Sequence, residues 1–434
     1  MKSSTMRKLA RSTRLVALLT TLALLVAACS GGDTTEDPAD DGDTTEDTED
    51  AGDDAGDDGE ETEDEGAEEA MGDPIQVGII TSSSGPLAAY GNQFLSGLEV
   101  GLDYATDGTG AVNGRPIEFI FEDAAGDPAQ ATSVVTDLIG QGVKIIAGTV
   151  VSGIALQVAP LAEQNDILYI SGPAAADGIT GINRNTFRAG RQSYQDVATA
   201  AGFLEDVEGK SVTVFAQDTA FGQANVAAVE AVLGTQGATV DSILVPEGTS
   251  DFTPFAARVN ENTPDLLFVA WAGETAAAMW ESLGQQGVLE ATTVVTGLAD
   301  RATWEPTFGD VADSIDFLAH YFAEAPDNAV NQYLVDNASE TPDLFTPDGF
   351  VTAQMIVQAL TEGDYDDTES MITALEGWTF EGPKGTQTIR AEDHAMLQPM
   401  FQASLSNTDG EISAESIGTV DADTVAPPVA SGEE

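Results

Sequence analysis

Short apolar runs alternate with stretches of helical spacing along most of the chain. The first pair is the apolar run at 75–80 and the amphipathic stretch at 89–105. Nearly every run is apolar throughout, as expected for parallel strands with helices on both faces of their sheet. The pattern predicts strands at 75–80, 117–123, 143–148, 167–172, 211–217, 238–245, 265–273 and 292–298, and helices at 89–105, 128–140, 153–164, 222–234, 254–259 and 275–285.

This alternation predicts βαβ units and therefore an α/β fold with mostly parallel sheets. About 345 residues belong to the folded part of the chain, more than one hydrophobic core usually supports, so two doubly wound lobes are expected. The rhythm breaks at 183–197, a segment that carries Arg184, Arg188 and Arg191, and we expect a crossover between the lobes there. Two lobes facing each other would place the carboxyl ends of their strands, where ligands bind in such sheets, across one cleft.

The N-terminus has the features of an export signal. Five basic residues precede the apolar run Leu15 to Ala28, which is too short to span a bilayer comfortably. The run ends at Cys29, the only cysteine, in the sequence "VAACSGG". This sequence resembles the lipobox of bacterial lipoproteins, which implies lipidation of Cys29 and an anchor on the outer face of the cell membrane. A free surface thiol is the alternative.

Acidic residues dominate the rest of the chain. Residues 30–73 hold 22 acidic and no basic residues, a composition typical of a disordered, extended tether; a weak cation-binding tract is the alternative. From residue 74 onward there are 52 acidic and 10 basic residues, a formal charge of −42, which excludes a nucleic-acid partner. We hypothesise a high-salt habitat. Stability that does not rise between low and molar NaCl would refute this hypothesis.

The sequence contains no recognisable catalytic or metal-binding motif. It has only two histidines, His320 and His394, and lacks the HExxH, CxxC and GxSxG patterns as well as a phosphate-binding P-loop. We therefore expect a protein that is not an enzyme and that holds no metal or cofactor. An extracellular hydrolase would need an activated nucleophile that the sequence does not show.

Three turns between predicted strands and helices are suited to ligand capture. Helix N-termini offer free N–H donors and partial positive charge, which accept a carboxylate without an arginine. In the turn at 81–91 the serines 82–84 are candidate helix caps, and in the second turn Ser152 is expected at an N-cap position. In the third turn, at 170–181, the small side chains of residues 174–176 leave the backbone sterically open. Ordinary capping is the competing interpretation for each turn. The candidate ligand contacts are Ser84, Tyr90, Ser152, Gly153, Ala174 and Ala176.

The second half of the chain places aromatic and acidic residues at the corresponding turns. Phe221 and Trp271 follow predicted strands and could form walls for an organic ligand, or could pack beneath their own helices. Glu274 and Asp300 are the acidic candidates. Polar turns in one lobe and aromatic walls in the other fit a small organic acid.

The ordered series SGP and YG (84–91), DPAQA (127–131), the serine after "IAGTVV" and FGQ (221–223) resembles the leucine/isoleucine/valine-binding family of solute-binding proteins for ABC importers. The resemblance covers about 75–405. It implies the type I periplasmic-binding-protein fold, with three crossovers and a hinge that closes on ligand. It also implies that Tyr90 covers the ligand, that Ser152 binds its carboxylate, that Ala174 gives a backbone contact and that Phe221 forms a wall.

Two positions depart from the amino-acid-binding members of that family. Ala176 stands where a threonine is common, and Leu298 or Ala299 stands where a glutamate pairs with the ligand's α-ammonium group. A buried ammonium without a carboxylate partner is strongly disfavoured. Either Asp300 or Glu274 substitutes, or the ligand lacks an α-ammonium group, which leaves amides, urea-like compounds and carboxylates as candidates.

The resulting hypothesis is a monomeric, lipid-anchored protein that captures a small solute and delivers it to an ABC permease and its ATPase. A surface receptor coupled to a signalling partner is the alternative. The second and third crossovers are expected near 318–323 and 382–389. The expected parts are a signal peptide (1–28), a tether (29–73), an N-terminal lobe (74–191 and 324–384), a C-terminal lobe (192–323 and 385–420) and a flexible tail (421–434).

Overall fold

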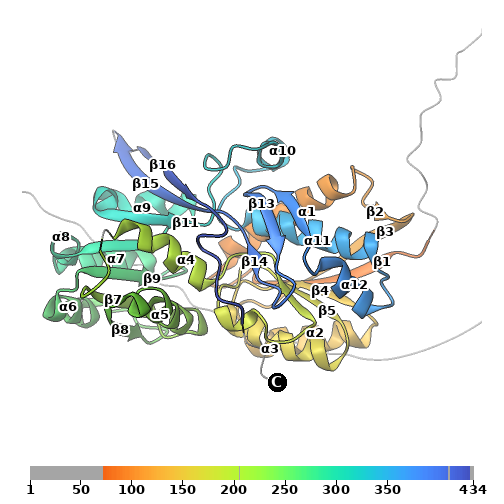
Figure 1. Ribbon diagram of the computed structural model, residues 1–434, viewed down its shortest axis with the longest axis horizontal. Helices are drawn as coiled ribbons and strands as arrows, with labels where there is room; N and C mark the ends of the chain where they lie inside the picture. The colour runs from red at the N-terminus through yellow and green to blue at the C-terminus, as the bar shows by residue number, and fades with distance from the viewer. Residues whose placement is uncertain (1–71, 205, 409–410, 431–434) are drawn as a thin grey trace, which may run out of the picture. The chain divides into compact units, whose positions relative to one another are not determined.

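A computed structural model describes residues 72–204, 206–408 and 411–430. The predicted signal peptide, Cys29 and the tether up to residue 71 lie outside the described residues, as do 431–434. The described chain forms two α/β lobes, each built on its own sheet (Figure 1). The prediction of two mainly parallel α/β lobes is therefore confirmed.

The first lobe is built on a six-stranded sheet in which all neighbours run parallel except the short edge strand β2. Its strands are β1 (Ile75–Thr81), β2 (Ala111–Val112), β3 (Arg115–Asp123), β4 (Ile145–Gly148), β5 (Leu168–Ser171) and β6 (Thr186–Arg188), in the spatial order β2-β3-β1-β4-β5-β6. Its helices are α1 (Ala88–Ala105), α2 (Pro128–Gly140), α3 (Ser152–Gln164), α11 (Thr346–Glu362) and α12 (Thr368–Leu375).

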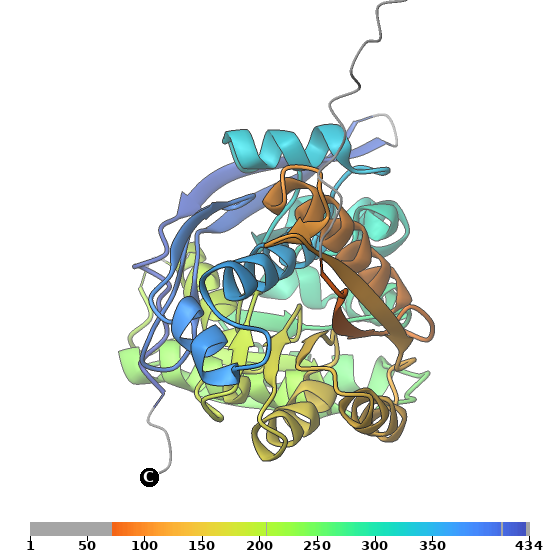
Figure 2. The ribbon, with the colours of Figure 1, turned by 90° about the vertical axis from the view of Figure 1, so that its right-hand side faces the viewer.

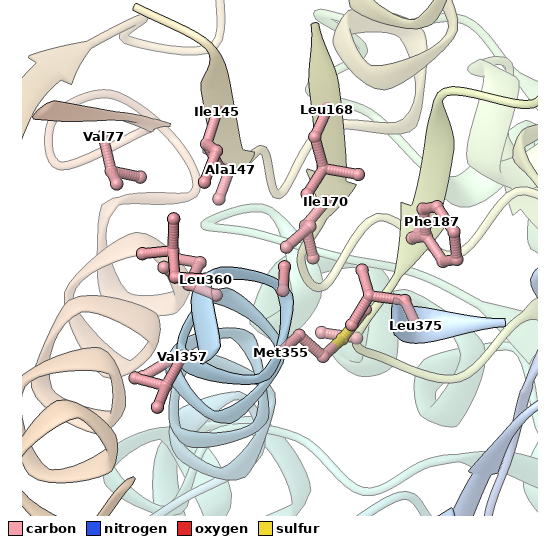
Figure 3. Close-up of a cluster of buried hydrophobic side chains, with 14 of the residues drawn as sticks. Val77, Ile145, Ala147, Leu168, Ile170, Phe187, Met355, Val357, Leu360 and Leu375 are labelled. Atoms are coloured by element: carbon pink, nitrogen blue, oxygen red, sulfur yellow. The ribbon is translucent and has the colours of Figure 1, made fainter. Parts of the chain in front are cut away.

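Successive strand residues of this sheet enter two different cores. Ile79 of β1 packs with Phe94 of α1 and Val351 of α11, whereas the next residue, Ile80, packs with Val135 of α2. Side chains alternate between the two faces of a strand, so continuous apolar runs are needed when helices cover both faces. Figure 2 shows α1 and α11 on one side of the sheet and α2 and α3 on the other. Figure 3 shows the core beneath α11, where side chains of β1, β4 and β5 meet those of the helix.

Helices α1 and α11 pack backbone to backbone through glycines. A Cβ atom added at Gly97 would lie 1.7 Å from the carbonyl oxygen of Thr346, and one added at Gly349 would lie 1.9 Å from that of Phe94. No side chain larger than hydrogen fits at either position. This close approach places the start of α11, and the loop before it, beside the first turns of α1.

The second lobe is built on a seven-stranded sheet within the described ranges. Its strands are β7 (Ser211–Gln217), β8 (Thr239–Val245), β9 (Leu266–Ala270), β10 (Thr293–Gly297), β11 (Ile315–Ala319), β15 (Met400–Thr408) and β16 (Glu411–Val420), in the order β16-β15-β11-β10-β9-β7-β8. Helices α4 (Ser193–Ala200) and α5 (Ala220–Val232) cover one face, and α6 (Thr253–Asn262), α7 (Ala276–Gln285), α8 (Val288–Ala291) and α9 (Trp304–Phe308) cover the other.

The first two of the three crossings between the lobes lie where they were expected. It enters the second lobe between β6 and α4, within the arginine-bearing segment, and leaves it after β11 ends at Ala319. Helix α10 (Ala329–Asn337) then packs on α1, where the rings of Tyr333 and Tyr104 meet with centroids 5.0 Å apart.

The third crossing lies later than the predicted limit at residue 384. Strands β12 (Thr379–Gly382), β13 (Gly385–Ile389) and β14 (Met396–Leu397) form a separate antiparallel sheet. Ile389 and Met396 are buried in the core of the first lobe, so the chain rejoins the second sheet only at Met400, the start of β15. Residues 385–397 thus belong with the first lobe, because their apolar side chains complete its core.

The expected flexible tail is also corrected for the residues that the structure describes. Val425 is fully buried, the guanidinium of Arg390 donates to the carbonyl of Pro427 at 2.7 Å, and the N–H of Ala430 donates to Asp393 at 2.8 Å. Residues 421–430 therefore pack against the β13–β14 region.

Candidate functional site

Two adjoining cavities lie at the carboxyl ends of the strands of the two sheets. The first, of about 430 Å³, is walled mainly by the second lobe, and the second, of about 370 Å³, is walled by the turns after β4 and β5 and by the start of α5. They share walls from both lobes and from the crossing segments. The shared residues are Pro86, Leu87, Tyr90, Arg191, Phe221, Ala272 and Phe345.

Ser152 and Gly153 line the second cavity, as expected, but Ser152 does not cap its helix. The N-cap residue of α3 is Val151, and Ser152 is the first helical residue. Its hydroxyl oxygen accepts the N–H of Ala176 at 3.2 Å, from the turn after β5. The hydroxyl proton is thereby left to donate elsewhere. Among the described residues, the backbone N–H groups of Ser152 and Gly153 have no hydrogen-bond partner.

The serines of the turn after β1 do not line either cavity, although Pro86 and Leu87 of the same turn do. The N–H groups of Ser83 and Ser84 donate to the carboxylate of Asp123, at 3.0 and 3.4 Å, and Ser84 is exposed. Helix α1 begins only at Ala88, so the serines are not its caps. The structure therefore does not place Ser84 in either cavity, as a ligand contact would require, because its backbone is held to the end of β3 instead.

Tyr90 lies in the first turn of α1 and borders both cavities. Its ring meets that of Phe345 edge to face, with centroids 4.8 Å apart. Burial, with a smaller contribution from the Asp300 carboxylate, raises the pKa of Tyr90 to about 12. The hydroxyl thus stays protonated and can donate a hydrogen bond at physiological pH.

Ala174 and Ala176 are buried and do not line either cavity. Their carbonyls accept hydrogen bonds from the guanidinium of Arg188, both at 3.1 Å, and the N–H of Ala176 is occupied by Ser152. Their neighbours Pro173 and Ala175 line the second cavity instead. The prediction for this turn was therefore off by one residue, since Pro173 and Ala175 line the cavity where Ala174 and Ala176 were expected.

The aromatic wall of the second lobe extends further than predicted. Phe221 lines both cavities and Trp271 lines the first, where its indole N–H donates to Thr275 at 3.0 Å and its ring stacks on Phe215. Trp271 thus packs on its own lobe and forms a wall at the same time. Trp280 of α7 and Phe308 of α9 also line the first cavity, with ring centroids 5.6 Å apart. Both residues lie within helices, so the sequence pattern at the strand ends does not identify them.

The two acidic candidates differ in environment. Asp300 is 8% exposed; its carboxylate accepts the N–H of Ala302 at 3.0 Å and the side-chain amide of Gln93, from α1. Burial raises its pKa. Glu274 also borders the first cavity but is exposed. Asp300 therefore links the lobes through Gln93, whereas Glu274 lies at the rim.

Three residues that line the first cavity were not predicted as site residues: two lie where the chain crosses between the lobes, and the third lies in the loop before α11. Arg191, Phe345 and His320 line the first cavity, the imidazole stacks on the Phe345 ring at 5.0 Å between centroids, and the guanidinium lies 5.5 Å from that ring's centroid. Burial, together with the positive charges of Arg191 and Lys384, holds the pKa of His320 well below its usual range. The imidazole is thus neutral.

Neither a metal-binding cluster nor a membrane-spanning helix is found among the described residues. No group of three or more histidine, cysteine, aspartate or glutamate side chains there is placed to hold a metal ion. No described helix combines the length and apolar character needed to cross a bilayer.

Two α/β lobes with cavities between their strand ends define a two-lobed binding protein. The family model described as "Periplasmic binding protein" matches residues 74–411. The chain belongs to this family, and its fold is the type I periplasmic-binding-protein fold.

Relatives and solved structures agree with this assignment. A Leu/Ile/Val-binding protein, BraC3 of Rhizobium johnstonii, is 23% identical over 307 residues, 70% of this chain and 83% of that protein. An ABC-type branched-chain amino acid transporter protein from Rhodopseudomonas palustris is 31% identical, with a TM-score of 0.68 over 82% of this chain and 99% of that chain. A solute-binding protein from the same species, in complex with 4-hydroxybenzoate, has a TM-score of 0.72 at 22% identity, over 80% and 97% of the two chains. These relatives are described as binding proteins or transporter components, not as enzymes.

Proposed function

We propose that this protein captures a small organic solute outside the cell, between its two lobes, and delivers it to an ABC permease and its ATPase. The observation that carries this proposal is the pair of adjoining cavities, which share walls contributed by both lobes. A ligand in contact with both lobes favours the closed state, because only that state lets it make all its contacts. Membership of the periplasmic binding protein family supports this function.

The second cavity is suited to a carboxylate. The start of α3 offers two unpaired N–H groups, at Ser152 and Gly153, and a serine hydroxyl whose proton is unused. Ser152 is 4% exposed, so a hydrogen bond made there is largely shielded from water. A helix N-terminus also carries a partial positive charge, which stabilises an anion.

The first cavity is suited to the apolar part of the same solute. Its walls include Phe221, Trp271, Trp280 and Phe308. Aromatic side chains provide large contact areas for an organic group. Relatives are described as binding leucine, isoleucine and valine, 4-hydroxybenzoate or benzoate, and these compounds define the first set to test.

Thermal shift of the mature chain tests the proposal. Amino acids, amides and carboxylates are each added at low and molar NaCl. A solute at 100 times its Kd stabilises the folded state by about 2.7 kcal/mol. For about 360 ordered residues this raises the Tm by roughly 3–4 °C. If no compound of these classes shifts the Tm, the proposed solute class is wrong.

Ser152→Ala tests the carboxylate site. The variant removes one hydroxyl donor to the ligand, and we expect affinity for a carboxylate ligand to fall by about tenfold or more, since a hydrogen bond to a charged group is worth roughly 1.5–3 kcal/mol. Ser84→Ala, at an exposed serine outside both cavities, is the matched control and is expected to leave affinity unchanged. Calorimetric titration measures both. Equal affinities for Ser152→Ala and Ser84→Ala would exclude Ser152 as the carboxylate donor.

The lipid anchor at Cys29 is part of the same proposal. It keeps the protein beside the permease at the outer face of the membrane. In the native host, Cys29→Ser is expected to release the protein from the membrane fraction into the medium. Retention of the variant in the membrane fraction would show that Cys29 is not the attachment point.

A further inference from the structure

Arg191 occupies a special place in the cleft. Of the seven described residues that line both cavities, it is the one charged side chain, and it is 5% exposed. It lies on the crossing segment between β6 and α4. A ligand that extends from one cavity into the other can therefore lie beside Arg191.

The contacts of Arg191 hold its guanidinium in place and leave one nitrogen unused. Nε lies 3.3 Å from the carboxylate of Asp196, and Nη1 donates to the carbonyl of Pro173 at 2.8 Å. The Phe345 ring packs beside the guanidinium. Nη2 makes no hydrogen bond to any described residue. A fixed guanidinium with a free N–H₂ is well suited to an anionic oxygen.

His320, which stacks on the same Phe345 ring, adds an independent observation. It is 4% exposed and lines the first cavity, and neither of its ring nitrogens has a hydrogen-bond partner within the described part of the chain. Buried polar groups are nearly always paired, so an imidazole without a partner among the described residues indicates a place for a ligand. The charged groups that act on this ring are the cations Arg191 and Lys384. Both cations are paired with carboxylates, Asp196 and Asp348, so an anion is favoured here by the free donors of the guanidinium and of the neutral imidazole.

The carboxylates at the cleft are poorly placed for an ammonium group. Asp196 is paired with Arg191, and Asp300 is engaged by Gln93 and by the N–H of Ala302. Glu274 is exposed at the rim. None of the three offers a buried, unpaired carboxylate beside the α3 N-terminus.

We propose that Arg191, with His320 beside it, is a specificity-determining anion contact, and that the solute is a carboxylate without an α-ammonium group. This inference rests on the proposed function and deepens it. The carboxylate lies where the two cavities meet, between Arg191 Nη2 and the start of α3, and the apolar body of the solute enters the recess walled by Trp280 and Phe308. The crossing segment between β6 and α4 thus supplies the residue that distinguishes a charged ligand from a neutral one.

The test compares each carboxylate with its carboxamide, which has nearly the same shape but no charge. The probes are benzoate with benzamide and 4-methylpentanoate with 4-methylpentanamide, and leucine supplies the ammonium-bearing analogue. Calorimetric titration of the mature chain is expected to favour at least one carboxylate over its amide by about tenfold or more, and over leucine likewise. A preference for the amide or for leucine would overturn the proposal.

Arg191→Gln then separates a ligand contact from a structural role. The variant is expected to bring the carboxylate-to-amide ratio to within about threefold, because the charged donor is lost. Arg301→Gln is the matched control. Arg301 also pairs with an acidic residue, Glu324 at 2.6 Å, and lies over an aromatic ring, but it lines neither cavity. This control is expected to keep the wild-type ratio.

Each remaining outcome decides between the two proposals. If Arg191→Gln weakens both probes by the same factor, Arg191 only supports the fold and the inference is overturned. If Arg191→Gln does not fold, Arg191→Lys takes its place. Its ammonium cannot keep the contacts to Asp196 and Pro173 and also occupy the position of Nη2, so the carboxylate-to-amide ratio is expected to fall at least threefold, and an unchanged ratio overturns the inference. If solutes bind but no carboxylate is preferred, the proposed function stands and this inference fails. If no solute binds at all, both fail.

Discussion

Lys384 and Asp348 form an ion pair with no exposed side-chain surface, and its removal should be strongly destabilising. Nζ lies 2.8 Å from Oδ1. Lys384 belongs to the turn between β12 and β13, and Asp348 belongs to the first turn of α11. Burial lowers the pKa of Lys384, so the protein holds this charge against a desolvation penalty.

Lys384→Met keeps most of the side-chain volume and leaves Asp348 buried without its partner. Breaking a buried ion pair in this way typically costs about 3–5 kcal/mol. With an unfolding entropy of about 2.1 cal/mol/K per residue, and about 360 ordered residues, this corresponds to a Tm lower by roughly 4–7 °C. Differential scanning calorimetry at pH 7 measures the shift.

Two further variants test the reasoning. Lys384→Met combined with Asp348→Asn removes both charges, and it is expected to recover much of the lost stability, because no unpaired charge then remains buried. Lys210→Met is the matched control at a pair whose side chains are 42% and 44% exposed, with Asp265 at 3.6 Å. Exposed pairs contribute little, so no shift beyond measurement error is expected. A Lys384→Met variant as stable as Lys210→Met would refute the account of the buried pair.

The other predictions concern helix packing and pH. Gly97→Ala is expected to lower the Tm by several degrees or to prevent folding, because the new Cβ would lie 1.7 Å from the Thr346 carbonyl oxygen, whereas Gly140→Ala, with nothing within 4 Å, should be neutral; equal melting of the two variants would contradict this. Burial raises the pKa of Asp343 to about 6, so between pH 6 and 4 the folded protein binds a proton that the unfolded chain does not, and this residue's contribution to stability rises as the pH falls. Relative to Asp343→Asn, the wild type should therefore gain stability, on the order of 2 kcal/mol, across that interval in urea unfolding, and a constant difference would exclude the raised pKa.

Helix α2 shows why many elements could be predicted from local sequence. The predicted range 128–140 is also the observed one. Asp127 accepts the N–H groups of Ala129 and Gln130, and Pro128 stands in the first turn, where its missing N–H leaves no bond unmade. Signals of this kind lie within a few residues of the feature they determine.

Ser152 shows where local sequence was insufficient. Serine before a helical pattern is a common N-cap, but the cap position falls on Val151. The hydroxyl is instead engaged by Ala176, from the next strand's turn. A partner 24 positions away leaves no trace in the sequence around the serine.

The group of site residues around Phe345 could not be predicted from the sequence at strand ends. Arg191 and His320 come from two crossing segments and Phe345 from the loop before α11, and only the packing of the two lobes brings the guanidinium and the imidazole together against the Phe345 ring. One signal was present: Arg191 is one of only ten basic residues after position 73, in a segment without periodicity. A rare positive charge in so acidic a chain could have identified it as a candidate site residue.

The position of Arg191 also connects recognition with closure. A solute that touched only the start of α3 would bind open and closed lobes equally and could not shift their equilibrium. A carboxylate held at the junction of the two cavities directs its apolar body into the recess of the second lobe, where Trp280 and Phe308 lie. The contacts at Ser152 and at the recess are then made together only when the lobes approach. In the proposed mode of binding, closure is therefore coupled to a solute that has both an anionic end and an apolar body, and a short anion without the apolar body does not favour the closed state.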